Sequence, residues 1–337
     1  MQLNVSPSAH PDWNEYLKNL DCNIYHSSEW AQSNHSDHEQ PLFFRWLEGE
    51  QCIGVGVGVE RWSHLPVVGN LIKHLNFESY PAVKDNSPRL LAEVLEQLKG
   101  HAKKKGYLSV SVNSFLAGAE LQNCEKIGYR PTRRIEFAID LQKTDDELFK
   151  NMATRHKRKV KKAYKCNLKF QEAATMEAMR EFRRLQVQSR DRRMKKGEFI
   201  GMMDDSYYEH LAKSYFREKL GRVFLITHEG QAVSAAFVSI YAGKGYYVYG
   251  GSSDAGFRMN APPLLFLNIF SRCRELGCSE FNMGGVPASS TDPEEQSHGL
   301  YMFKAGFGGE EIHCANLLAD NLQPVKGSLV KFIKKIR

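Results

Sequence analysis

The spacing of apolar residues predicts strands and helices in a regular order along the first third of the chain. Short apolar runs bounded by turn residues predict strands at Leu42–Leu47 and Cys52–Glu60, joined by a hairpin turn. Apolar residues three or four positions apart predict a helix from Pro88 that Gly106 ends. A strand at Tyr107–Val112 follows, so the two kinds of element alternate here.

The middle of the chain is predicted to be mainly helical. Thr144 and Glu147 form a capping-box pattern at the start of a helix that continues to Lys165, with its apolar residues on one face. Elsewhere the pattern predicts a short helix at Trp13–Leu20, a capped helix start at Ser27–Trp30 and a strand at Arg134–Leu141. Further helices are predicted at Ala117–Ile127, Thr175–Met194, Asp205–Leu220 and Leu322–Arg337.

The second half repeats the order of the first. It has strands at Arg222–His228, Gln231–Tyr241 and Tyr246–Gly250, a helix from Pro263 to Leu276 and a strand at Cys278–Met283. Four landmarks recur: the turn glycines Gly49 and Gly230 lie 181 residues apart, Pro88 and Pro263 lie 175, Gly106 and Gly277 lie 171, and Lys126 and Lys304 lie 178. The two lysines open Lys126-Ile127-Gly128-Tyr129 and Lys304-Ala305-Gly306-Phe307. The nearly constant spacing indicates an internal duplication.

Three alternating glycines lie in one of the predicted strands. Gly54, Gly56 and Gly58 alternate with valines in Cys52–Glu60. A phosphate-binding loop would place its glycines where a strand turns into a helix, and no helix opens after Arg61. The pattern therefore favours a strand with one face stripped of side chains.

Composition indicates a globular protein of two ordinary domains. The chain has 337 residues, of which 42% are hydrophobic and 11% aromatic. No apolar run approaches the roughly 18 residues that span a bilayer, and acidic residues near the start argue against a signal peptide. Seven cysteines without a Cys-x-x-Cys pair favour reduced, structural thiols. We expect a cytoplasmic protein that uses no metal or other cofactor.

The positive charge of the chain is concentrated in one segment. Lys150–Lys165 holds eight Lys or Arg and no acidic residue; removing these eight from the total of 46 leaves 38 basic against 39 acidic residues. A solvated helix face is the commoner reading of such a run, but those faces usually mix signs. The segment therefore favours contact with phosphates or RNA, through Arg155, Lys157, Arg158, Lys159, Lys161 and Lys162.

The duplicated order of elements resembles the GNAT (acyl-CoA N-acyltransferase) fold used twice, which implies an α/β (α+β) protein with a mixed, twisted sheet flanked by helices in each copy. Tandem copies with a basic helix after the first resemble the Fem family of aminoacyl transferases in a compact form. The resemblance is most specific in the basic helix, in Tyr246–Ser253, in Asn282–Gly285 and in Phe303-Lys304. It implies a first domain at residues 1–145, onto which a helix at 320–337 could pack back, and a second at 146–319.

The family resemblance implies an amide-forming transferase. Fem enzymes move an aminoacyl group from aminoacyl-tRNA to an amine of a peptidoglycan precursor. An aminoacyl ester is already activated, so the protein has mainly to align the reactants and stabilise the oxyanion. The resemblance assigns this role to Lys304, with Phe303 beside it. A lysine before a glycine also suits a helix C-terminus, so we expect Lys304 to act at the reaction centre and Lys126 only to end a helix.

The acceptor residues follow from the same resemblance. The family holds a phosphorylated sugar-peptide with basic and tyrosine residues, which here correspond to Arg192, Arg193, Tyr247 and Tyr249. Where the family commonly has a lysine, this chain departs from it with Ser33 and Asn34. The expected partners are therefore aminoacyl-tRNA and a sugar-peptide or other cell-envelope precursor. Stable DNA binding is not expected, and a lipid-linked acceptor would bring the protein to the membrane surface.

Two other functions stay open. An acyl-CoA or acyl-carrier-dependent N-acyltransferase acting on an amino sugar or amino acid would keep the fold. Against CoA, Pro262 and Pro263 have no N–H where a GNAT enzyme binds the pyrophosphate, and Ser87-Pro88 in the first copy is no better. A non-catalytic RNA-binding protein would use the basic helix and not Lys304.

Overall fold

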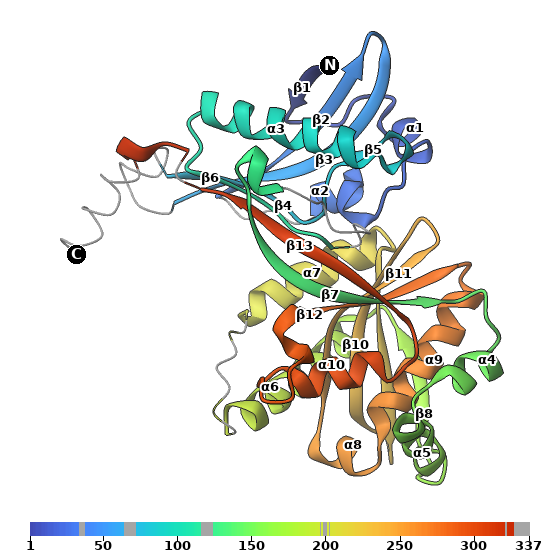
Figure 1. Ribbon diagram of the computed structural model, residues 1–337. Coiled ribbons are helices and arrows are strands. Elements are labelled where there is room, and N and C mark those ends of the chain that lie inside the picture. The colour runs from blue at the N-terminus through green and yellow to red at the C-terminus, as the bar shows by residue number, and fades with distance from the viewer. Residues whose placement is uncertain are drawn as a thin grey trace. The chain divides into compact units, whose positions relative to one another are not determined.

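The computed structural model describes residues 1–33, 38–63, 72–115, 124–195, 197, 201, 203–320 and 322–326. The chain divides into two compact units, Met1–Arg134 with His313–Arg337 and Ile135–Ile312. The division falls inside two strands, β7 (Arg130–Asp140) and β13 (Glu310–Ala319), so each strand contributes to both units (Figure 1). The boundary at 145/146 from the sequence refers to the two copies of the repeated fold, and it stays a prediction.

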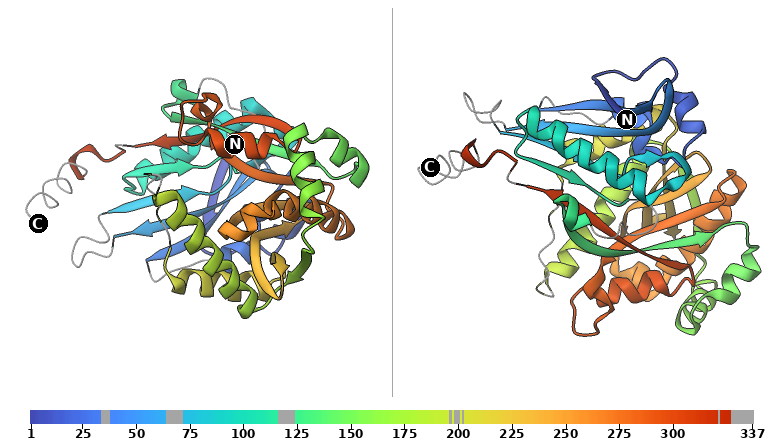
Figure 2. Two further views of the ribbon diagram at one scale, coloured as in Figure 1. Left: turned by 90° about the horizontal axis from the view of Figure 1, so that it is seen from below. Right: turned by 45° about the horizontal axis from the view of Figure 1, so that its top comes forward.

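The first unit is built on a mixed sheet. Its strands are β1 (Gln2–Ser6), β2 (Glu39–Glu48), β3 (Gln51–Trp62), β4 (Lys73–Phe77) and β6 (Ser109–Val112), which lie in this order with β13 at the end; the short β5 (Ala82–Val83) pairs with β3. Neighbours are antiparallel except β4 and β6. Helix α3 (Pro88–Lys104) lies along these strands, and its apolar residues join their core (Figures 1 and 2). Two short helices, α1 (Trp13–Lys18) and α2 (Ser28–Ser33), precede β2.

The glycine-rich strand is confirmed, and its neighbour explains the glycines. A Cβ at Gly58 would lie 2.7 Å from the ring of Phe77, and one at Gly56 would lie 3.2 Å from the same ring. Phe77 is fully buried, so a side chain at Gly58 would have to displace the ring, and one at Gly56 would press against it. Gly56 and Gly58 thus leave space for the Phe77 ring, whereas a Cβ at Gly54 would lie 3.4 Å from the Ala82 carbonyl oxygen.

The second unit has a sheet covered by helices on both faces. Its strand order is β7, β12 (Glu280–Pro287), β11 (Lys244–Ser252), β10 (Gln231–Tyr241), β9 (Gly221–His228) and β8 (Lys169–Ala173). Ala236 and Val238 of β10 belong to the core formed with α9 (Ala261–Glu275). Phe237, between them, packs on the opposite face against Phe182 of α6 (Met176–Met194) and Tyr215 of α7 (Asp205–Arg217).

The single helix predicted from Thr144 to Lys165 is two helices. The capping box at Thr144 is confirmed and opens α4 (Asp145–Asn151), but α5 begins only at Thr154 and ends at Ala163. Met152 and Ala153 between them are extended, with ψ of 146° at both. The break lets the Ala153 amide donate to the Gly306 carbonyl, 2.9 Å away. A bond to another part of the chain therefore replaces the helical continuation.

Several elements were missed or lie outside the described residues. The sequence pattern did not predict the edge strands β1 and β8. Of the helix predicted at Ala117–Ile127, the described part is a 3-10 helix, Cys124–Ile127. Most of the helix predicted at Leu322–Arg337 lies outside the described residues. All seven cysteines are described, and none forms a disulfide. Within the described part of the chain, no helix combines the length and apolarity needed to cross a bilayer.

Candidate active site

Strands β11 and β12 stop pairing midway along their length. Their parallel ladder joins Lys244 to Glu280, Gly245 to Phe281 and Tyr246 to Asn282, and both strands then continue without pairing to each other. On its other side, β11 carries an irregularity at Val248, because Val238 and Phe237 of β10 pair with Tyr247 and Tyr249. Backbone groups of both strands are thus available for other partners where the strands part.

Lys304 lies at this point. It comes from α10 (His298–Ala305), its side chain is 4% exposed, and its Nζ donates to the Gly285 carbonyl at 3.1 Å. Gly285 lies three residues beyond Asn282, the last β12 residue that pairs with β11. Gly284 has a φ of +69°, and a Cβ there would lie 3.4 Å from the lysine Nζ. The strand end is therefore shaped around a buried ammonium group.

A buried polar network supports the same strand end. Asn282 is 1% exposed; its Nδ2 donates to Glu136 Oε2 of β7 at 2.8 Å, and its Oδ1 accepts from the Gly284 amide at 2.6 Å. Glu136 is itself buried. Burying a carboxylate costs free energy unless donors compensate it, so this arrangement is costly to disturb. It fixes the turn that presents Gly285 to Lys304.

Tyr247 borders the ammonium group. Its ring centroid lies 5.7 Å from Lys304 Nζ and meets the Phe266 ring edge to face at 4.9 Å. A Cβ at Gly250 would lie 2.1 Å from the Tyr247 hydroxyl, so the ring lies over a position that only glycine can occupy. Burial raises the pKa of Tyr247 to about 12, although the charge of Arg193 acts in the opposite direction. The phenol is therefore a neutral hydrogen-bonding group at physiological pH.

Two of the other predicted acceptor residues, Tyr249 and Arg192, contact other parts of the unit, whereas the charge of Arg193 acts on Tyr247. Tyr249 meets Tyr207 of α7, with 3.0 Å between the hydroxyls, on the sheet face opposite α9. Arg192 donates to the Ser252 carbonyl at 3.0 Å and to Asp254 at 3.2 Å, and it lies 4.1 Å from the centre of the Phe257 ring. The fold thus brings Tyr247 to Lys304 and its neighbour Phe303. Different side chains contact Arg192 and Tyr249.

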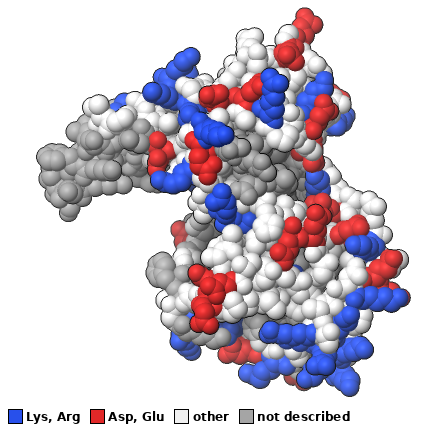
Figure 3. Space-filling model, viewed as in Figure 1, with Lys and Arg blue, Asp and Glu red and all other residues white. Residues whose placement is uncertain are grey.

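The basic residues of α5 form an exposed surface. Arg155, Arg158, Lys161 and Lys162 are exposed, and Figure 3 shows Lys and Arg side chains gathered where Figure 1 places α5. The two remaining cations are half-buried. Lys157 donates to the Lys150 carbonyl at 2.8 Å, and burial together with Arg155 lowers the pKa of Lys159. We call the six cations predicted above the α5 basic face.

The start of α9 is poor in amide donors. The helix begins at Ala261, and Pro262 and Pro263 fill the next two positions. Asn260, before it, has a φ of +59° and no side-chain capping bond. Two of the first three N–H groups that would face an anion are therefore missing.

The two repeated lysines differ in environment. Lys126 is exposed in the 3-10 helix Cys124–Ile127, whereas Lys304 is buried. Their following glycines differ as well. Gly128 has a φ of +80°, which favours glycine, but Gly306 has an ordinary φ of −64° and faces the His156 ring. The shared motif thus serves two local structures.

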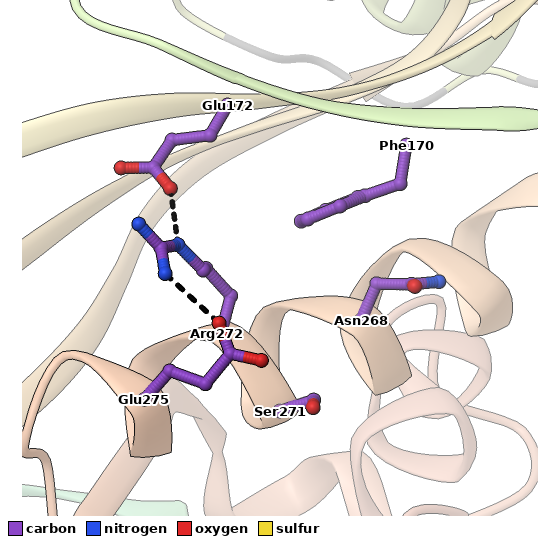
Figure 4. Close-up of a pocket in the computed structure, with 6 residues that line it drawn as sticks. All are labelled: Phe170, Glu172, Asn268, Ser271, Arg272 and Glu275. Atoms are coloured by element: carbon purple, nitrogen blue, oxygen red, sulfur yellow. Dashed lines mark hydrogen bonds and ion pairs between the residues drawn. The ribbon is translucent and has the colours of Figure 1, made fainter.

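A surface hollow of about 390 Å³ on α9 and β8 is a weaker candidate. Figure 4 shows Arg272 between two carboxylates, with 2.5 Å to Glu172 and 2.8 Å to Glu275. The charges that line this hollow therefore compensate one another. Among the described residues, no group of three or more His, Cys, Asp or Glu side chains could hold a metal ion.

Sequence reasoning missed two residues near Lys304. Glu136 is the acidic residue between Ile135 and Phe137 in a strand that is buried on both faces. His156 interrupts the basic run at a position four before Val160, which the helix buries in the core. The position of His156 on the apolar face of an otherwise cationic helix was the signal in the sequence that could have identified it as buried.

Comparison with known proteins supports an acyltransferase. Residues 149–296 match the family model described as acetyltransferase (GNAT) domain. FemX has a similar structure, with a TM-score of 0.71, 14% identity and coverage of 96% of this chain and 98% of the other. A tandem GNAT protein from the clavulanic acid biosynthesis pathway gives 0.57 at 10% identity, covering 95% and 99%. L-PGS from Bacillus licheniformis gives 0.51 at 14%, covering 98% of each chain. No curated protein matches the sequence. The chain has the tandem GNAT-like α/β fold.

Proposed function

We propose that this protein transfers an aminoacyl group from aminoacyl-tRNA to an amine of a peptidoglycan or other cell-envelope precursor. The observation that carries the proposal is the ammonium group of Lys304, held where β11 and β12 stop pairing. The likeness to FemX supports it. We place the reaction in the cytoplasm.

The chemistry requires a fixed cation more than an acid and base pair. Attack of an amine on the ester carbonyl forms the new C–N bond and develops negative charge on the carbonyl oxygen. Collapse breaks the C–O bond to the ribose, and the amine proton passes to solvent or to the leaving oxygen. A buried ammonium stabilises either oxygen strongly, because water is excluded and no reorganisation is needed. Lys304 and Tyr247 supply one cation and one neutral hydroxyl.

The donor is proposed from charge. The α5 basic face offers a cationic surface suited to the phosphates of tRNA, and the two prolines of α9 weaken the usual pyrophosphate site. Ribonuclease treatment of the assay separates the donors. Loss of transfer supports aminoacyl-tRNA, whereas unchanged transfer would overturn this donor.

A second candidate is an acyl-CoA or acyl-carrier-dependent N-acyltransferase that acts on an amino sugar or amino acid. The match of residues 149–296 to an acetyltransferase (GNAT) domain favours it. This candidate predicts transfer from an acyl thioester in the presence of ribonuclease.

The RNA surface has a direct test with a matched control. The triple variant R155A/R158A/K162A removes three exposed cations from α5, and K103A/K104A/K105A removes three exposed cations near the end of α3. Binding of deacylated tRNA should weaken in the first variant, with a salt slope smaller by about 3, and stay within twofold in the second. Equal behaviour of the two variants would contradict a specific role of α5.

A further inference from the structure

The C-terminal end of α10 depends on a side chain from another helix. The last four carbonyls of a helix have no partner within it and must be satisfied elsewhere. In α10, the carbonyls of Met302, Lys304 and Ala305 accept from the amides of Gly306, Phe307 and Gly308. The fourth, that of Phe303, accepts from His156 Nε2 at 3.0 Å. His156 thus completes the hydrogen bonding of the turn that carries Lys304.

The same imidazole fits closely against the end of the helix. Its ring lies 4.8 Å from that of Phe307 in an edge arrangement, and a Cβ at Gly306 would lie 2.3 Å from its Cε1. His156 is 2% exposed. A second bond, from the Ala153 amide to the Gly306 carbonyl at 2.9 Å, joins the same two segments.

The donor state of this histidine follows from its partner. A carbonyl oxygen only accepts, so Nε2 carries the proton. Burial, with the charges of Lys159 and Arg155, lowers the pKa of His156 to about 4, and the bond to Phe303 opposes this. The neutral ring therefore donates throughout the physiological range.

Because His156 belongs to α5, the bond connects two features of the molecule. Arg155 and Lys157, its sequence neighbours, belong to the α5 basic face, while Phe303 precedes Lys304. From these contacts we infer that His156 is a positioning residue, which fixes Lys304 relative to the α5 basic face through the Phe303 carbonyl. The inference rests on the proposed function where it concerns the donor. A donor bound through its phosphates would then present its ester to an ammonium at a set distance.

The role of the N–H is separable from that of the ring. His156→Gln keeps an N–H at about the reach of Nε2, and His156→Phe keeps an aromatic ring over Gly306 without a donor. His298 offers a matched control, since its Nδ1 donates to the Ser290 carbonyl at 3.0 Å at the other end of α10. All variants should bind deacylated tRNA as the unaltered protein does, because the α5 basic face is retained.

The test measures transfer and Lys304 reactivity together. His156→Phe should lower kcat 10- to 100-fold with little change in KM for aminoacyl-tRNA, since small misplacements of a reacting group cost this much. His156→Gln and His298→Phe should stay within threefold. Independently of any donor, acetic anhydride should label Lys304 faster in His156→Phe and at the normal rate in His156→Gln. His156→Met replaces His156→Phe if the latter does not fold.

The outcomes separate the inference from the proposed function. Equal Lys304 labelling in all variants would overturn the inference, whatever happens to transfer. Faster labelling in His156→Phe alone, with no transfer from aminoacyl-tRNA by the unaltered protein, would support the inference and remove the proposed donor.

Discussion

The ammonium group of Lys304 lies 3.1 Å from the carbonyl oxygen of Gly285, in the part of β12 that no longer pairs with β11. A side-chain cation thus takes a place that the next strand would otherwise fill. The bond holds a positive charge in a buried position, where its effect on a developing oxyanion is large. The fold itself therefore creates the environment that the proposed chemistry needs.

The two motif glycines should respond differently to the same substitution. Gly306→Ala should lower the free energy of unfolding by about 1–3 kcal/mol, because the new methyl group meets the His156 ring. Gly128→Ala should cost about 1–2 kcal/mol through its left-handed φ of +80°. Chemical denaturation gives both values.

A second substitution distinguishes the two causes. Adding His156→Ala to Gly306→Ala should cost less than the sum of the single variants, because the clash is removed. Lys99 is the side chain nearest to Gly128, so Lys99→Ala is the corresponding partner there. It should leave the cost of Gly128→Ala unchanged. Strict additivity in the first pair would contradict the close packing of His156 on Gly306.

His156 should make stability fall with acidity. Its folded pKa of about 4 lies below the ordinary value of 6.5, so between these values the unfolded state binds a proton that the folded state does not. Its contribution is fully present above pH 6.5 and is lost as pH falls towards 4. Between pH 7 and pH 5 the loss amounts to about 2 kcal/mol. Chemical denaturation at pH 7 and pH 5 gives the free energy of unfolding of the unaltered protein and of His156→Gln. The unaltered protein should lose more between the two pH values, and the difference is the contribution of His156.

Asn282→Asp should destabilise the protein in a pH-dependent way. The substitution keeps an acceptor for Gly284 but turns the donor to Glu136 into a second buried carboxylate. We expect the free energy of unfolding to fall by about 3 kcal/mol at pH 7. Repulsion between two close carboxylates raises the pKa of one of them, so that this group takes up a proton as the pH falls. The loss in the free energy of unfolding should therefore be smaller at pH 5 than at pH 7.

The control for this variant is a second asparagine in the same unit. Asn268→Asp, on α9, removes a bond from Nδ2 to the Leu264 carbonyl of its own helix, a backbone acceptor and not a carboxylate. It should change the free energy of unfolding by less than 1 kcal/mol, and this change should be the same at pH 5 as at pH 7. A pH-independent loss for Asn282→Asp would contradict the contact with Glu136.

Periodicity in the sequence predicted most elements, and the resemblance of their repeated order to the GNAT fold predicted the fold class. Four landmarks repeated with nearly constant spacing, and each reports a local feature such as a turn or a helix end. The break at Met152–Ala153 was not predictable, because its cause is the Gly306 carbonyl, more than 150 residues away in the chain. Local propensity carries no information on such a partner.

The candidate site was predicted only in part, because it too depends on contacts between distant parts of the chain. Lys304 was singled out by its repeated motif and by resemblance, but its burial depends on where β11 and β12 stop pairing. The alternation of Tyr247 and Tyr249 was visible in the sequence, although the faces they occupy were not. Glu136 and His156 each looked like an ordinary polar residue until tertiary contacts gave them partners.

The rate of transfer in Lys304→Met and Lys126→Met tests the central claim most directly. Single-turnover rates with aminoacyl-tRNA are measured below the unfolding temperature of each variant, since Lys304 also satisfies the Gly285 carbonyl. We predict a loss of about 10²- to 10³-fold for Lys304→Met. Lys126→Met should stay within twofold, because Lys126 is exposed in a separate 3-10 helix. A folded Lys304→Met variant that transfers as fast as Lys126→Met would contradict the account.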